Sequence, residues 1–357
     1  MKKSIDSFFF QITFSASLRG DLFNYLEILF MKKIGLLLFI TFLGMAVTTN
    51  ATPSMVDFER QWIFPKELAG FKFLGAEKYQ DADRGYNLYF GSEEKGAVLE
   101  LSVFDQGLKS IPEGCKSNEI KTLLKTSEDE LIWKKNQKKL KCVKRQKDFI
   151  FPRTAPSFCC AHFEYAMINQ PTQTVHKVVG ATGSKNQFMV FRYVFDETGK
   201  DDLRVKIPQI STTLSKILSE KPDEDNLLLS ACGIFLESPS SFPGIFSAQY
   251  LMGHAQNMDN LNVYPQFFVW PKSYYAKPRN ADLLIAAYFA GVLQVVIPAH
   301  LDEGGEFEGF IAMLNTYKKL RQADQIKSIE TLDQWIEEAD KKALFEKVIH
   351  LPLPDDD

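Results

Sequence analysis

The sequence predicts an α+β protein, in which an antiparallel sheet with two helices is followed by a small, mainly helical domain. Three observations support this fold class. Between residues 71 and 195, short segments rich in β-branched and aromatic residues are separated by turn residues, which is typical of strands. Two longer segments in residues 117–220 show helical spacing of their apolar residues. Beyond residue 282 only helical patterns follow, so most helices are segregated from the strands along the chain.

The predicted strands follow one another along the first half of the chain. Residues 91–96 and 183–186 are predicted to be turns, and Pro152 to Ser157 separate the two arms of an expected hairpin. Together these segments predict an antiparallel sheet of about six or seven strands. The strand segments are 86–90, 97–104, 140–150, 158–168, 175–181 and 188–195.

Two helices are expected to cover one face of this sheet. The first spans residues 117–133, with Ser117 as its N-cap and Leu123, Leu124 and Leu131 among its apolar positions. The second spans residues 201–220 and is interrupted near Pro208. This half forms the predicted sheet domain, residues 55–220.

A polar segment with a proline, residues 221–226, predicts a linker to a helical domain over residues 227–351. Residues 232–280 have weak periodicity, so no helix is predicted there. Three helices follow: 282–297, apolar nearly all round and expected to be a buried core helix; 306–321, with an amphipathic stripe; and 331–349, opened by a capping box at Thr331. Residues 352–357 form an acidic tail.

The N-terminal region resembles an export signal that begins inside the chain. Met31-Lys32-Lys33 precedes an apolar run that ends at Val47, and small or polar residues follow as far as Ala51. The run is shorter than the roughly 20 apolar residues of a membrane span. We therefore predict a signal peptide over residues 31–51, cleavage near Ala51, and a periplasmic or secreted product. Residues 1–30 are a gene-start artefact or an extension that makes the run an uncleaved anchor.

Composition restricts the classes of partner. The apolar fraction of 45% and the charged fraction of 24% are those of a globular protein. The net charge of −3 gives no indication of nucleic-acid binding, and the membrane is expected to be contacted only through the signal segment.

Export permits disulfides, but the odd number of cysteines leaves their pairing open. The cysteines are Cys115, Cys142, Cys159, Cys160 and Cys232.

The strongest candidate for catalysis is the trio Cys160, His162 and Glu164. Alternate residues of a strand share one face, so these side chains are expected to project together. A thiol beside an imidazole that a carboxylate orients is the arrangement of a cysteine nucleophile. Alternatively, the trio is the solvated face of an amphipathic strand, opposite a core face that includes Phe163 and Tyr165.

A second candidate is an aromatic stretch in the segment without periodicity. Tyr264, Phe267, Trp270 and Tyr274 either line a groove for a peptide or glycan, or pack the loop onto its own domain. The histidines at positions 162, 176, 254, 300 and 350 lack metal-ligand spacing, and no cofactor fingerprint occurs. We therefore predict neither a metal site nor a cofactor.

Two stretches carry a resemblance to a known family. Phe64-Pro65 followed by Leu68-Ala69-Gly70-Phe71, and later Ile111-Pro112-Glu113-Gly114 before a helix, resemble a group of uncharacterised exported bacterial proteins with an FPxxLAGF opening and an IPxG stretch. The match covers residues 64–195 and departs from the group's pattern at Gly85 and Cys115. The resemblance implies a cell-envelope setting and no known activity.

Two functions follow from these features. The first is a non-enzymatic exported protein that binds or contacts an envelope protein or a glycan. The alternative is an envelope hydrolase or transferase that uses Cys160, His162 and Glu164, or a histidine of the helical domain, such as His254 or His300.

Overall fold

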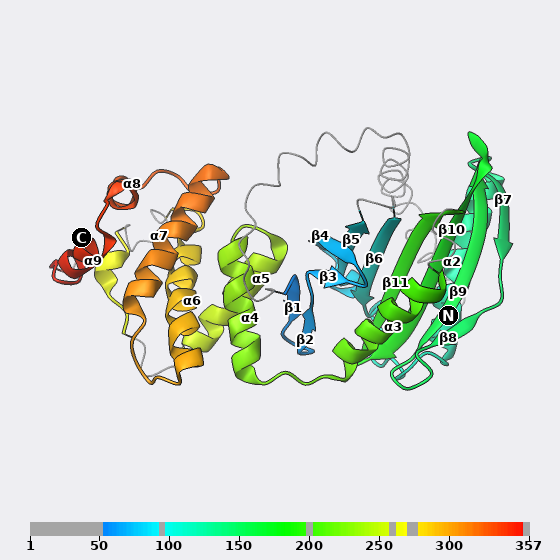
Figure 1. Cartoon of the computed structure of the whole chain (residues 1–357), viewed down its shortest axis with the longest axis horizontal. Coiled ribbons are helices and arrows are strands. Elements are labelled where there is room, and N and C mark those ends of the chain that lie inside the picture. Colours follow the sequence, from blue (N-terminus) through cyan, green and yellow to red (C-terminus); the bar gives the residue numbers. More distant parts are fainter. Residues whose placement is uncertain (1–52, 93–96, 198–202, 257–261, 270–277, 353–357) are drawn as a thin grey trace. The chain divides into compact units, whose positions relative to one another are not determined.

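The computed structural model describes residues 53–92, 97–197, 203–256, 262–269 and 278–352 (Figure 1). The predicted signal peptide, the segment before it and the acidic tail beyond residue 352 lie outside the described residues. The described residues belong to one compact unit, so a division into two domains at residues 221–226 stays a prediction. The fold class is confirmed: an antiparallel sheet is followed by a mainly helical part.

The sheet contains nine strands, all paired antiparallel. Its order is β3-β4-β5-β6-β11-β10-β9-β7, with the short β8 also on β9. A separate hairpin, β1 (Met55–Asp57) and β2 (Trp62–Phe64), precedes it. The strands are β3 (Glu67–Leu68), β4 (Phe71–Lys78), β5 (Tyr86–Ser92), β6 (Ala97–Phe104), β7 (Leu140–Arg145), β8 (Phe149–Phe151), β9 (Phe158–Met167), β10 (Gln170–Ser184) and β11 (Gln187–Asp196).

The two helices of this part lie on opposite faces of the sheet, which corrects the expectation that both cover one face. The apolar residues of α2 (Asn118–Asn136), such as Leu124, join a core with Phe163 of β9. Those of α3 (Leu203–Ser219), such as Leu214, join a second core with Phe191 of β11. We call these the α2 face and the α3 face. Because both faces carry a helix, both sets of alternate side chains of the central strands are buried.

The helical part begins earlier than predicted. α4 (Glu224–Glu237) starts inside the expected linker, where the Asp223 side chain accepts a hydrogen bond from the backbone N–H of Asn226. α5 (Phe242–Ala255) follows, capped in the same way by Ser241. α5 and the C-terminal part of α4 fall in the stretch that lacks periodicity, because both helices are apolar on nearly every side and α5 opens with proline and glycine.

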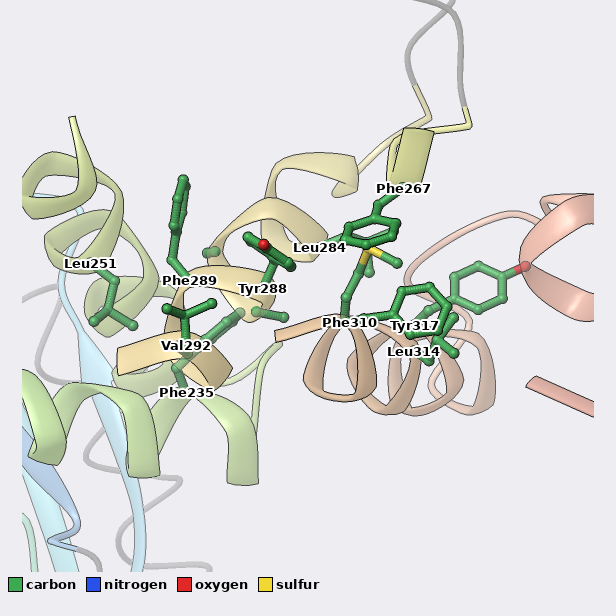
Figure 2. Close-up of a cluster of buried hydrophobic side chains, with 14 of the residues drawn as sticks. Phe235, Leu251, Phe267, Leu284, Tyr288, Phe289, Val292, Phe310, Leu314 and Tyr317 are labelled. Atoms are coloured by element: carbon green, nitrogen blue, oxygen red, sulfur yellow. The ribbon is translucent and has the colours of Figure 1, made fainter. Parts of the chain in front are cut away.

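The central helix of this part is α6 (Ala281–Ala299), which packs against α7 (Glu306–Gln322) at two glycines. A side chain at Gly291 would lie 2.5 Å from the carbonyl oxygen of Glu308, and one at Gly309 would lie 2.8 Å from that of Tyr288. The backbones of the two helices therefore approach each other closely at these glycines. Figure 2 shows the surrounding cluster, in which Leu251 of α5 and Phe310 of α7 lie on either side of α6.

α6 is also the one helix among the described residues that is long and apolar enough to cross a membrane. However, 61% of its most apolar window is buried inside the protein. Tyr288, at its middle, is fully buried and its hydroxyl donates to the carbonyl of Asn262. This packing agrees with the expectation of a buried core helix.

The last predicted helix, 331–349, is two helices in the structure. α8 (Glu330–Glu337) ends at Glu338, and α9 (Lys341–Ile349) begins after Asp340. Asp340 accepts a hydrogen bond from the backbone N–H of Ala343, which is the interaction of an N-cap residue. The capping box expected at Thr331 is absent, because α8 begins one residue earlier and has no side-chain cap.

Candidate functional site

The trio Cys160, His162 and Glu164 lies on β9, with all three side chains on the α3 face. Cys160 and His162 are buried, so the interpretation as a solvated face is wrong for these two. The thiol of Cys160 belongs to the core under α3 and contacts the carbonyl oxygen of Phe158 at 3.8 Å. Burial raises the pKa of this thiol well above its usual value. A nucleophilic cysteine needs the opposite shift, so the geometry does not support catalysis by Cys160.

The partner of His162 is a second histidine, on the neighbouring strand. His176 of β10 lies directly opposite Glu164 in the strand pairing, and Val178 lies opposite His162. His162 and His176 are therefore diagonal neighbours on one face, within reach of long side chains. Their facing ring nitrogens, His162 Nε2 and His176 Nδ1, are 3.1 Å apart.

Glu164 completes a group of three possible metal ligands. Its Oε1 lies 4.0 Å from His176 Nδ1, and the ligand atoms of His162, Glu164 and His176 all lie within 4.8 Å of one another. The His176 side chain is fully buried, whereas that of Glu164 is 22% exposed and connects the group to solvent. We call these three residues the histidine–carboxylate cluster.

A second carboxylate orients the buried ring from its other side. His176 Nε2 lies 2.8 Å from Oε2 of Glu197, which follows the end of β11. A carboxylate at this position can accept a hydrogen bond from Nε2, and Nδ1 faces His162. Phe195 stacks on the same ring at 5.1 Å between centroids and limits its rotation. This is the arrangement of a metal-ligating histidine whose second nitrogen is held by a carboxylate.

Sequence reasoning missed this cluster because it looked for metal ligands within single segments. The alternation of Cys160, His162 and Glu164 places two of the ligands on one face. The third ligand depends on the register between β9 and β10. That register includes an irregularity between Gln170 and Thr174, which the sequence does not reveal. Only the proximity of two histidines on consecutive strands could have indicated it.

The histidines of the helical part do not form a comparable group among the described residues. His254 of α5 pairs with Glu224 at 3.4 Å, and that carboxylate is 68% exposed. His300 ends α6 in a left-handed conformation, as a C-cap residue. Neither residue is brought to the histidine–carboxylate cluster in any described contact.

The aromatic stretch packs onto its own part of the protein, as far as it is described. Phe267 is fully buried, and its ring lies 4.9 Å from Phe310 and 5.6 Å from Tyr288. Tyr264 packs beside it at 5.4 Å. A fully buried ring cannot line an open groove, so the ligand-binding role predicted for Phe267 is not supported. The other two candidates, Trp270 and Tyr274, lie outside the described residues.

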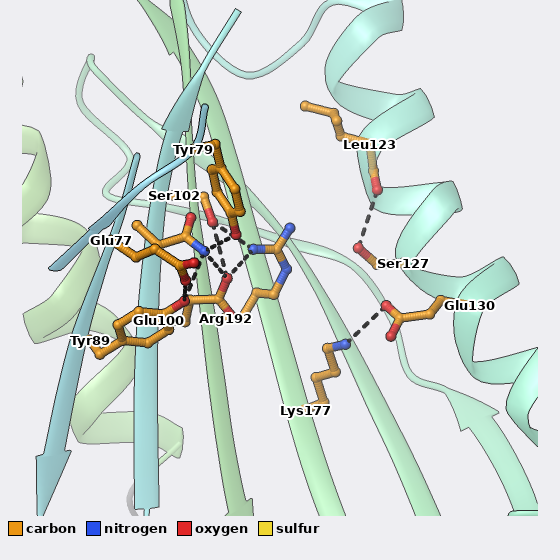
Figure 3. A network of polar contacts seen from close by, with 11 residues as sticks. Glu77, Tyr79, Tyr89, Glu100, Ser102, Leu123, Ser127, Glu130, Lys177 and Arg192 are labelled. Atoms are coloured by element: carbon orange, nitrogen blue, oxygen red, sulfur yellow. Dashed lines mark hydrogen bonds and ion pairs between the residues drawn. The ribbon is translucent and has the colours of Figure 1, made fainter. Parts of the chain in front are cut away.

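A network of polar contacts lies on the α2 face, over strands β4 to β6 and β11 (Figure 3). Glu100 accepts hydrogen bonds from Asn87, Ser102 and Arg192, at 3.1, 3.2 and 3.0 Å. Asn87 also donates to the hydroxyl of Tyr79 at 2.7 Å. Because its members satisfy one another, the network replaces an apolar core on this half of the sheet.

Comparison with known proteins adds little to this picture. No protein-family model matches the chain, and no curated protein matches it. Among solved structures, the chain is similar to cyanobacterial PsbP (CyanoP) from Synechocystis sp. PCC 6803, with 10% sequence identity and a TM-score of 0.29. The match covers 50% of this chain and 95% of CyanoP.

Proposed function

We propose that this chain is an exported, non-enzymatic binding protein of the bacterial cell envelope. Its ligand is a divalent transition-metal ion, held by His162, Glu164 and His176. The observation that carries the proposal is the pair of ring nitrogens that face each other at 3.1 Å inside the sheet.

The spacing of the cluster suits zinc. Tetrahedral ligands bound at 2.0–2.1 Å lie roughly 3.3 Å from one another. The two ring nitrogens are already close to that separation, so the buried rings are preorganised. Glu164 Oε1, at 4.0 Å from His176 Nδ1, needs a shift of under about 1 Å, which its partly exposed side chain allows. Two imidazoles and one carboxylate form a ligand set suited to Zn²⁺, with a water molecule as the fourth ligand.

Binding is favoured over the alternative of an envelope hydrolase or transferase that uses Cys160. The thiol that the alternative needs is buried with no exposed surface, and burial holds it protonated. The features that support export are the signal-like segment and the resemblance to exported bacterial proteins. An envelope protein or glycan as a further partner remains part of the proposal.

Calorimetric titration of the tag-free protein with ZnCl₂, after treatment with a chelator, tests the proposal. We expect one Zn²⁺ per chain. Glu164→Gln and His162→Gln should each weaken binding about tenfold or more, because each removes one ligand. His254→Gln is the matched control, since it removes a partly exposed histidine outside the cluster. Absence of binding, or equal weakening by the control, would contradict the proposal.

A further inference from the structure

We infer that Cys115 and Cys159 are a site of oxidative modification, at which a small-molecule disulfide converts the two thiols into an intramolecular disulfide. The pair lies on the α2 face, at the start of β9 and just before α2. The histidine–carboxylate cluster lies on the α3 face, so the test of either site leaves the other standing.

The backbone brings the two cysteines together. Cys159 lies opposite Ala181 of β10. Gly114 forms an isolated bridge with Gly183, two residues further along β10, through reciprocal N–H···O bonds of 2.8 and 2.9 Å. Since Gly183 also pairs with Phe188 of β11, Gly114 must lie on the side of β10 that β9 occupies. Ala181 and Gly183 are two residues apart on β10, which corresponds to about 7 Å along the strand. Gly114 therefore lies about that far from Cys159 along this edge of β10, and Cys115 follows directly after Gly114.

This close approach requires glycine at position 183. A side chain there would lie 2.1 Å from the carbonyl oxygen of Pro112, so the segment before α2 rests directly on the strand. Cys115 then leaves the plane of the sheet towards α2, on the face where Cys159 projects. Disulfides need Cα atoms within about 7 Å and side chains that point together, and neighbouring positions on one face favour both.

The two thiols are neighbours and are reachable. Cys115 is among the groups that raise the pKa of Cys159, and both residues line a cavity of about 440 Å³. Cys115 is buried and Cys159 is half-buried. Lys116, Lys121 and Asp148 line the same cavity, which gives a polar oxidant access to the pair. Cys160, the neighbour of Cys159 in sequence, projects from the opposite face and is excluded from this pairing.

The oxidation balances with a small-molecule disulfide such as glutathione disulfide. The thiolate of Cys159 attacks one sulfur of the oxidant and releases one glutathione thiol. The thiol of Cys115 loses its proton and attacks the resulting mixed disulfide, which releases the second glutathione. The protein loses two electrons and two protons, and the oxidant gains them as two thiols.

The reaction should be slow at neutral pH. Burial, and then the neighbouring Cys115, raise the pKa of Cys159 to about 12. Below that pKa the thiolate fraction rises about tenfold for each pH unit, so the rate of oxidation should rise about tenfold per unit between pH 7 and pH 9.

Peptide mapping of the full-length protein tests the inference. The reduced protein is incubated with glutathione disulfide, digested without reduction and analysed by mass spectrometry. We expect one cross-linked peptide pair, joining Cys115 to Cys159. Cys115→Ser should instead retain glutathione on Cys159, whereas the control Cys142→Ser should still form the pair. A different pairing in the wild-type protein, or no disulfide at any pH up to 9, would overturn the inference.

Discussion

The substitution Phe267→Ala separates a core role of the aromatic stretch from a ligand-binding role. Phe267 has no exposed surface, and its ring lies within 6 Å of Tyr264, Tyr288, Phe310 and Phe345. Removing the ring forfeits about 2.5 kcal/mol of transfer free energy, and the cavity left behind adds a similar cost. We therefore expect a loss of about 5 kcal/mol from the free energy of unfolding, a large share of the 5–15 kcal/mol typical of a domain.

Urea denaturation followed by far-UV circular dichroism measures this loss. Tyr264→Ala is the matched comparison, because that ring contacts the same cluster but is only half-buried. We expect it to cost about 1–2 kcal/mol. A loss below about 1 kcal/mol for Phe267→Ala would refute the reasoning, since it would mean that the ring contributes little to the core. Failure of the variant to fold would support the core role.

Three further predictions concern single residues or residue classes. Ser117→Ala should lower the free energy of unfolding by about 1 kcal/mol in thermal or urea denaturation, because Ser117 accepts the backbone N–H of Ile120 at the start of α2; an unchanged value would exclude it as a cap. In the reduced protein, iodoacetamide should label Cys142 first, because it is exposed, and label Cys232 only after denaturation, because burial raises its pKa to about 12; equal labelling rates by mass spectrometry would contradict this. Lys177, and then Lys134, lower the pKa of Glu130 to about 2. The ionised Glu130 carboxylate therefore stabilises the fold above the usual glutamate pKa, and this stabilisation is lost as the pH falls towards 2. Since the Glu130 side chain is 46% exposed, solvent screens the pair. Glu130→Gln should therefore remove less than about 1 kcal/mol of this pH dependence, measured by urea denaturation between pH 5 and pH 2; a stability that still falls as steeply in the variant would assign the effect to other groups.

Local patterns predicted those parts of the fold that depend on neighbours in sequence. The alternation along β9 correctly placed Cys160, His162 and Glu164 on one face, and Ser117 correctly marked the start of α2. The burial of this face depends on α3, which packs against it from a later part of the chain, and this is a tertiary property. The burial of Cys160 was therefore not predictable from the pattern of its own strand.

The histidine–carboxylate cluster depends on strand register, which local patterns do not set. A change of one residue in the pairing of β9 and β10 would turn His176 to the other face relative to Glu164.

Two helices of the helical part were not predicted, for a different reason. α4 and α5 are apolar on most sides, so the period that distinguishes an amphipathic helix is weak in their sequences.

The most direct test of the central claim is to locate the metal itself. Crystals grown with equimolar ZnCl₂ and measured at the zinc absorption edge should give one strong anomalous peak. We predict that it lies about 2 Å from both His162 Nε2 and His176 Nδ1, with Glu164 as a third ligand. A direct hydrogen bond between the two rings with no peak there, or a peak only at surface residues such as His254, would contradict the account.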